Sequence, residues 1–274
     1  MTHAERGDQV VLDEASHIVW SEEWGVAYVC GLFPRLVESV GGRMEPEAVR
    51  EAIERSLLGH LPSTSLVCLE SSHNFGGGTA LGSEYLGPIA EIARARGAWT
   101  HLDGARLLNT CAALGEEPRA AAAGIDSVVL NLNKGLSAPG GAVLAGTRSF
   151  IAEARLNLRR VGGSAGHQAG ILAAAGLVAL RTMVPQHAED NRRARLLAER
   201  LNELDRVAVD LDRVQTNIVV VQLDDAPALA LELGRRGLGT LPMGPNGLRL
   251  VTHRHVTDAS VERAVELLAA AAGA

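Results

Sequence analysis

The sequence has a single lysine, few cysteines and no long apolar run, and each of these shortages excludes a class of protein. Proteins that bind nucleic acid through a basic face carry clustered Lys and Arg. Here the net charge is −6 and no block of like charge occurs. We therefore expect no nucleic-acid partner.

A membrane location is also not expected. A helix that crosses a bilayer needs roughly 20 apolar residues in a row, and no run approaches that length. The N-terminal stretch MTHAERGDQVV lacks the apolar segment of a signal peptide. These features predict a cytoplasmic protein without a membrane partner.

The cysteines predict neither disulfides nor a metal site. Cys30, Cys68 and Cys111 are an odd number, and they show no C-x-x-C and no Cys/His spacing typical of metal ligands. In a reducing cytosol, such residues behave as small buried hydrophobes. We therefore expect three free thiols and no bound metal.

Short runs rich in Val, Ile and Leu alternate with longer amphipathic segments in this chain of 274 residues, of which 47% are hydrophobic. Buried strands are predicted at 9–14, 65–70, 99–103, 127–132 and 142–146. Helices are predicted between them at 46–58, 84–97 and 106–123. Strands separated by helix-length crossovers favour an α/β fold with a mostly parallel, doubly wound sheet.

From about residue 148 the pattern changes to consecutive helices followed by strands. The predicted elements are helices at 148–160, 165–182 and 188–205, strands at 207–211 and 217–223, a helix at 226–236, a strand at 247–253 and a helix at 257–272. Pro185 and Gln186 lie between two of these helices and mark a boundary. Because the length allows a large and a small domain, we expect a large domain over 1–186 and a smaller α+β domain over 187–274.

Polar residues follow several of the predicted strands. In open α/β sheets, ligands bind beyond the carboxyl ends of the strands. Asp13 and Asp103 end two strands, Ser71-Ser72-His73-Asn74 follows another, and Lys134 follows a fourth. Arg249 lies within a strand of the second domain. These groups of complementary charge are therefore expected to converge on one edge of the sheet.

Lys134 is the sharpest of these candidates. A lysine in partly apolar surroundings loses part of its preference for the charged form, which favours Schiff-base formation. A carboxylate at a neighbouring strand end, such as Asp103, can pair with the protonated nitrogen of a pyridine cofactor. Taken alone, a strand-end lysine is more often simply solvated and a strand-end aspartate more often caps a helix, so these alternatives stay open.

Four stretches carry a resemblance to a known family. In chain order they are LESSHNFGGGTALGSEYLGPIAEIARARGAWTHLDGARLLNTCAALG, LNKGLSAPGGAVLAG, GHQAGILAAAGLVAL and LRLVTH. They contain a THN-like turn, an H-x-D-G-A-R segment and a lysine followed by G-L-x-A-P. With these motifs the chain resembles the low-specificity L-threonine aldolases over essentially its whole length. The resemblance implies a fold-type I pyridoxal-phosphate (PLP) enzyme with the PLP-dependent transferase-like fold, usually a homotetramer with active sites shared between subunits.

The resemblance also implies roles for individual residues. Lys134 would form the Schiff base with PLP, and Asp103 would hold the protonated ring nitrogen. Arg106 and Arg249 would surround the cofactor and bind the substrate carboxylate, because guanidinium groups orient a carboxylate as well as neutralise it.

Two histidines complete the implied site. His17 would stack on the cofactor ring, and His60 would lie near the substrate hydroxyl. Without the resemblance, His17 is a histidine at a helix start and His60 a surface-loop histidine. His73 is assigned no role.

The implied reaction is the retro-aldol cleavage of L-threonine, L-allo-threonine or related β-hydroxy amino acids to glycine and an aldehyde. A base, which is His60, His17 or a water that they position, would remove the hydroxyl proton as the Cα–Cβ bond breaks. General-base help of this kind contributes about 10²–10⁴-fold to a rate.

Three departures from the family pattern affect the surroundings of the phosphate and the lysine. Family members have a further N-terminal segment before the position of Met1, with a Ser/Thr-Gly-Thr turn that cups the phosphate at a helix N-terminus. His167 stands where the family has an arginine, and Asn133 where serine is common. The glycine-rich runs 76–78 and 162–164 are weak substitutes, and flexible loops are expected there.

Other interpretations stay open beside the aldolase. Another fold-type I activity, such as β-elimination or amino-acid racemisation, would use the same lysine and aspartate. The chain is alternatively a short, catalytically weak or non-catalytic subunit, with an exposed apolar surface that promotes association. Part of a longer aldolase is favoured, because Lys134, Asp103, Arg106 and Arg249 have no obvious structural reason to occur together.

Overall fold

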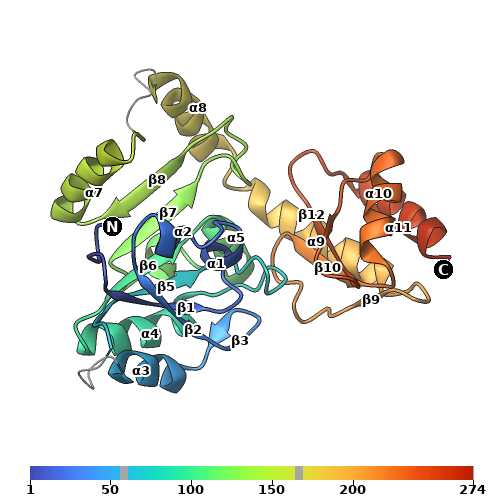
Figure 1. Cartoon of the computed structure of the whole chain (residues 1–274). Helices are drawn as coiled ribbons and strands as arrows, with labels where there is room; N and C mark the ends of the chain where they lie inside the picture. The colour runs from blue at the N-terminus through green and yellow to red at the C-terminus, as the bar shows by residue number, and fades with distance from the viewer. Residues whose placement is uncertain (56–60, 164–168, 274) are drawn as a thin grey trace.

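A six-stranded sheet forms the centre of the N-terminal part of the molecule (Figure 1). The computed structural model describes residues 1–55, 61–163 and 169–273. In spatial order the strands are β2 (Phe33–Val37), β1 (Gln9–Asp13), β5 (Thr64–Glu70), β6 (Trp99–Asp103), β7 (Ser127–Asn131) and β8 (Ala142–Gly146). Neighbours from β2 to β7 pair in parallel, and β8 pairs antiparallel with β7. The expected α/β fold with a mostly parallel sheet is confirmed.

Helices lie on both faces of this sheet. They are α1 (His17–Trp20), α2 (Gly25–Tyr28), α3 (Pro46–Arg55), α4 (Ser83–Ala95), α5 (Leu107–Leu114), α6 (Pro118–Ala121), α7 (Arg148–Arg160) and α8 (Ala169–Thr182). Successive strand residues point to opposite faces. Val11 therefore packs in the buried cluster under α3 and α4, whereas Val10 and Leu12 pack with α1 and α2 on the other face. A two-stranded hairpin, β3 (Ser39–Val40) and β4 (Arg43–Met44), follows β2.

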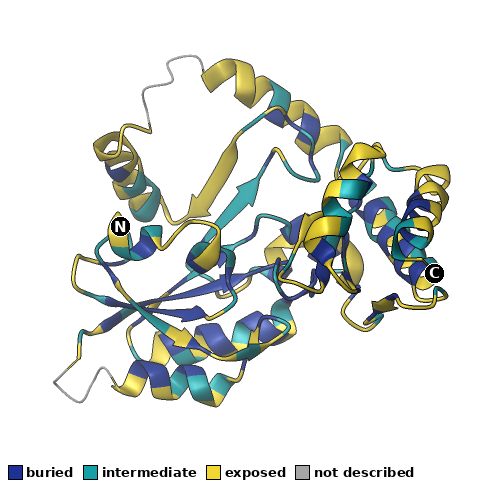
Figure 2. Ribbon diagram, turned by 45° about the vertical axis from the view of Figure 1, so that its right-hand side comes forward, coloured by how far each residue is buried: buried dark blue, intermediate teal, exposed yellow. Residues whose placement is uncertain are grey.

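The sheet is open at β8, and here the expectation of a buried strand is wrong. Every residue of β8 is exposed, including Val143 and Leu144. Figure 2 shows β8 and most of α8 as exposed, and α8 presents Ile171 and Val178 to solvent with 72% and 60% of their surface accessible. The apolar pattern predicted the strand correctly, but such a pattern does not show whether another segment of the chain packs over the strand.

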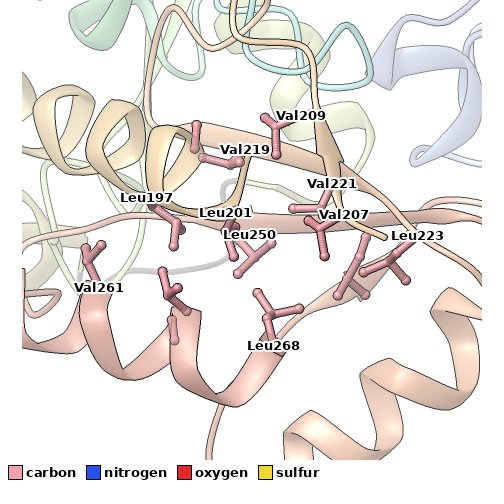
Figure 3. Packing of buried hydrophobic residues seen from close by; sticks show 14 of the residues in the cluster. Leu197, Leu201, Val207, Val209, Val219, Val221, Leu223, Leu250, Val261 and Leu268 are labelled. Atoms are coloured by element: carbon pink, nitrogen blue, oxygen red, sulfur yellow. The ribbon is translucent and has the colours of Figure 1, made fainter. Parts of the chain in front are cut away.

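A second, smaller sheet organises the C-terminal part. Its strands, in spatial order, are β11 (Leu241–Pro242), β12 (Gly247–Val251), β10 (Ile218–Gln222) and β9 (Ala208–Val209), all antiparallel. The helices of this part are α9 (Gln186–Leu201), α10 (Ala226–Arg235) and α11 (Asp258–Ala272). Figure 3 shows their shared core, in which Leu201, Val219 and Leu268 are almost inaccessible to solvent. The expected smaller α+β unit is thus present.

Hydrogen bonds join the two parts. The side chain of Asn191 on α9 accepts a hydrogen bond from Asn109 on α5 at 3.0 Å and donates to the main-chain oxygen of Asn109 at 2.8 Å. The hydroxyl of Thr216 donates to the carbonyl of Gly78 at 2.6 Å. Because α9 contacts both α5 and the second sheet, the division between residues 186 and 187 stays a prediction.

Three further expectations concern the helix at 106–123, the cysteines and membrane-spanning helices. The single helix expected at 106–123 is two helices, because Gly115 adopts a left-handed conformation (φ 68°) and ends α5. Cys30, Cys68 and Cys111 are free thiols, as predicted. Within the described ranges, no single helix is long and apolar enough to cross a bilayer; α8 and α9 meet that criterion only together, with a 70° bend between them.

Candidate functional site

Two carboxylates and one lysine occupy the carboxyl edge of the first sheet. Glu70 and Asp103 end adjacent strands and are register partners. Lys134 follows β7 in a loop closed by main-chain hydrogen bonds, in which the N–H of Ser137 donates to the carbonyl of Lys134 at 2.8 Å. The N–H of Ala138 donates to the carbonyl of Leu132 at 2.9 Å in the same loop. The loop is therefore fixed at the edge where the carboxylates lie.

Lys134 is half-buried, and its pKa is lowered. Burial is the largest cause, and the positive charges of Arg106 and Arg249 lower the pKa further. Asp103 and Glu70 oppose the shift without reversing it. The amine therefore loses its proton more readily than a solvated lysine, as a nucleophile requires.

Asp103 supports both interpretations of a strand-end aspartate. Its Oδ1 atom accepts a hydrogen bond from the N–H of Ala105 at 3.0 Å, which is a local cap of the following turn. The residue also lines a cavity of about 170 Å³ together with Glu70, His101 and Val129. One carboxylate oxygen thus has a structural role, while the side chain still borders a space beside the strand ends.

Two arginines concentrate positive charge at this edge. Burial lowers the pKa of Arg106 to about 10, and the charge of Arg249 on β12 contributes to the shift. Burial also lowers the pKa of Arg249. The Nε atom of Arg249 is buried and has no hydrogen-bond partner within the part of the chain that the structure describes. A buried, unpaired guanidinium N–H beside a second guanidinium is suited to an anion.

His17 lies at the same end of the sheet. It is the first residue of α1, and its main-chain N–H donates to Oε2 of Glu70 at 2.7 Å. Its ring Nδ1 lies 3.2 Å from Oε1 of Glu22. His60 and His167 fall outside the described residues, so the roles expected at these positions stay predictions.

A buried contact between a histidine and two carboxylates at this edge was assigned no role from the sequence. Nε2 of His73 lies 3.1 Å from Oδ2 of Asp13 and 3.9 Å from Oε2 of Glu70. Burial opposes ionisation of Asp13, but the hydrogen bond and charge of His73 outweigh it and lower the pKa of that carboxyl. Burial raises the pKa of Glu70. The sequence signal that could have revealed this contact is that two apolar strands, β1 and β5, each end in an acidic residue, Asp13 and Glu70.

The glycine run 76–78 is not the flexible loop that the sequence predicted. All three glycines are buried. A Cβ on Gly78 would lie 2.7 Å from Oγ1 of Thr216, so the turn packs closely against the second sheet. The run connects the two parts of the molecule and shows no feature of a phosphate cradle.

Comparison with solved structures identifies the class of fold. A threonine aldolase from Leishmania major superposes with a TM-score of 0.78 at 18% identity, covering 97% of this chain and 78% of that chain. A structure of SPT with a PLP internal aldimine superposes with a TM-score of 0.72 at 20% identity, covering 98% of this chain and 68% of that chain. The fold is that of the fold-type I PLP enzymes, a class in which a lysine holds the cofactor.

Comparison at the level of sequence identifies the family. A family model for beta-eliminating lyases matches residues 1–225. The probable low-specificity L-threonine aldolase 2 of Arabidopsis thaliana is 38% identical over 266 residues, which is 94% of this chain and 74% of that protein. The chain belongs to the beta-eliminating lyase family, in its low-specificity L-threonine aldolase branch.

Proposed function

We propose that this chain is a PLP-dependent aldehyde-lyase that cleaves L-threonine, L-allo-threonine and related β-hydroxy amino acids to glycine and an aldehyde. One observation carries the proposal: the only lysine in the chain is half-buried after a strand end, where the charges of two carboxylates and two arginines act on it. Membership of the aldolase branch supports the choice of substrate.

The residues present fit the cofactor and its substrate. Lys134 would hold PLP covalently, Asp103 would keep the ring nitrogen protonated, and His17 would lie against the ring. When bound, PLP withdraws electrons from the substrate Cα, which makes loss of a substituent from that atom feasible. The Nε atom of Arg249 is buried and has no hydrogen-bond partner among the described residues, so it is available to a ligand group.

The arginines decide which substrate bond breaks. Arg106 and Arg249 would bind the substrate carboxylate from two sides, with the fork geometry that fixes its plane as well as its place. Holding the carboxylate in this way places the Cα–Cβ bond where it can be broken. Because both guanidinium groups are partly desolvated, their attraction for an anion exceeds that of solvated arginines.

The proton of the β-hydroxyl must leave as the bond breaks. His60, His17 or a water that they hold would accept it, and the carbon that becomes glycine then takes up a proton. The side chain of Glu22, 3.2 Å from Nδ1 of His17, would orient the imidazole for that role.

The experiment is a product analysis of the purified chain with excess PLP. Glycine and acetaldehyde from threonine, with no turnover by Lys134→Ala, are the expected result. Pyruvate and ammonia from serine, or a change of configuration at Cα, would replace the aldolase with another fold-type I activity. Absence of a visible cofactor band that borohydride removes would contradict PLP binding altogether.

We also infer self-association and a cytoplasmic location. Exposed apolar side chains on β8 and α8, including Val143, Ile171 and Val178, support burial against another copy. The expected assembly is a homotetramer, as is usual for the low-specificity L-threonine aldolases. The three free cysteines suit a reducing compartment.

A further inference from the structure

Four buried polar side chains lie beneath the strand-end site. Asp13, Glu70, His73 and Asn74, here called the carboxylate–histidine cluster, are each less than 8% exposed. Polar groups are buried at a cost unless their hydrogen bonds are satisfied. The partners of each group therefore show what the cluster holds in place.

Glu70 uses both carboxylate oxygens to hold the main chain. Oε2 accepts the N–H of His17 at 2.7 Å, and Oε1 accepts the N–H of Asn74 at 2.7 Å. Both hydrogen bonds favour the ionised form of Glu70 and oppose the rise of its pKa that burial causes. One side chain at the end of β5 thus fixes both the first residue of α1 and the turn after β5.

His73 lies between the two carboxylates. The N–H of Gly76 donates to Nδ1 of His73 at 2.9 Å, so the ring proton is on Nε2. Nε2 lies 3.1 Å from Asp13 and 3.9 Å from Glu70. Asp13 in turn accepts the N–H of Ala15 at 2.6 Å, at the start of the segment that leads to α1.

The cluster also reaches the arginines. Nη1 of Arg106 donates to Oδ1 of Asn74 at 3.5 Å, a long, partly buried hydrogen bond. The charges of Glu70 and Asp103 both act on Arg106 and raise its pKa against the effect of burial. A continuous path of contacts therefore runs from His17 through Glu70 and Asn74 to Arg106.

We propose that the carboxylate–histidine cluster positions both His17 and Arg106 at the strand ends, with Glu70 as the central positioning residue. The contacts of His17 and Arg106 with cofactor and substrate rest on the proposed function. Their placement by the cluster is independent of that function, because every hydrogen bond involved lies within the chain. Glu70 acts through these neighbours and is not assigned a contact with the reacting atoms.

Glu70→Gln tests the placement in the full chain without added cofactor. Its amide retains one acceptor oxygen but directs an NH₂ group at either the N–H of His17 or that of Asn74. Amide exchange followed by NMR should be about tenfold or more faster at one of these positions. Glu47→Gln, which changes a surface carboxylate paired with Arg50 on α3, should leave both rates unchanged.

The same variants loaded with PLP test the consequence. In Glu70→Gln the visible circular dichroism of the bound cofactor should change, because Glu70 no longer fixes the main chain that carries His17. Asn74→Ala should instead raise KM for the amino acid severalfold while leaving exchange at His17 unchanged. Should Glu70→Gln fail to fold, Asp13→Asn carries the test, because its amide opposes the Nε2–H of His73 and should also accelerate exchange at His17.

Two results would overturn the proposal. The first is unchanged exchange at both His17 and Asn74 in Glu70→Gln, or at His17 in Asp13→Asn if that variant carries the test. The second is faster exchange together with an unaltered cofactor spectrum and unaltered KM. A chain that never forms a covalent PLP product would contradict the proposed function, while the exchange rates would still decide the placement.

Discussion

A single amine dominates the chemistry at the scale of the residue. Lys134 is the only lysine, so reagents specific for amines report on it and on the α-amine of Met1. Its lowered pKa has a definite physical origin, which is first burial and then the positive charges of Arg106 and Arg249. Both causes make the neutral, nucleophilic form more abundant near neutral pH.

The lowered pKa of Lys134 is directly measurable. Reductive methylation with ¹³C-formaldehyde labels Lys134 and Met1, and NMR titration follows each amine separately. The midpoint for Lys134 should lie below its ordinary value of 10.5. Arg106→Gln should move that midpoint upward, since it removes a positive charge that disfavours the ammonium form. A midpoint at or above 10.5 in the unsubstituted chain would contradict the burial of the amine.

Local motifs predicted part of the site. Lys134, Asp103 and Arg106 lie at or just after strand ends, so their convergence follows from the parallel sheet alone. The approach of Arg249 depends on how the second sheet packs against the first, which no local pattern encodes. His73 escaped assignment because its partner Asp13 lies sixty residues away in sequence and on a different strand.

At the scale of the element, α9 fixes the loop that carries Lys134. His187, on α9, is 2% exposed, and its ring Nδ1 donates to the carbonyl of Val184 at 2.9 Å. A Cβ on Gly135 would lie 2.6 Å from Nε2 of His187. The residue that follows Lys134 therefore needs to be glycine for α9 to approach this closely.

Gly135→Ala should destabilise the fold by about 1–3 kcal/mol, the usual cost of overpacking a close contact. Urea unfolding measures the change. Adding His187→Ala should recover part of the loss, because it removes the group with which the new methyl collides. Gly170→Ala is the matched control, since nothing lies within 4 Å of its Cβ and alanine is preferred to glycine in helices by up to about 1 kcal/mol. Equal unfolding midpoints for Gly135→Ala and the unsubstituted chain would contradict this packing.

Strands with a clear apolar sequence pattern were predicted, and strands without one were missed. The apolar runs of β1, β5, β6 and β7 were unambiguous, and each forms a strand of the first sheet. β2 was missed because its sequence, FPRLV, contains a proline and an arginine; such residues are tolerated where a strand lies at the sheet edge. The two-residue strands β3 and β4 are too short to show any periodicity.

At the scale of the whole molecule, the most unusual feature is the exposure of the β8 edge and α8. Helices of globular proteins normally turn an apolar stripe toward the core. Here α8 exposes Ile171, Leu172, Leu177 and Val178. Burial of this surface against another copy is therefore expected to stabilise the protein.

Ile171→Glu combined with Val178→Glu should weaken self-association. Charges placed at the centre of an apolar contact are desolvated without a partner. Sedimentation velocity should show the unsubstituted chain as an oligomer and the double variant as a smaller species with unchanged secondary structure. Leu231→Glu, at an exposed position of α10, is the control and should not alter the distribution. A monomeric unsubstituted chain, or an oligomer insensitive to both substitutions on α8, would contradict the role of this surface.

The most direct test of the account is the site at which PLP attaches. The purified chain is incubated with PLP, reduced with borohydride, digested and analysed by mass spectrometry. The account predicts one pyridoxyl group, on the peptide containing Lys134, and its loss in Lys134→Ala. A label confined to the α-amine of Met1, or an equal label in Lys134→Ala, would contradict the assignment of Lys134 as the residue that holds the cofactor.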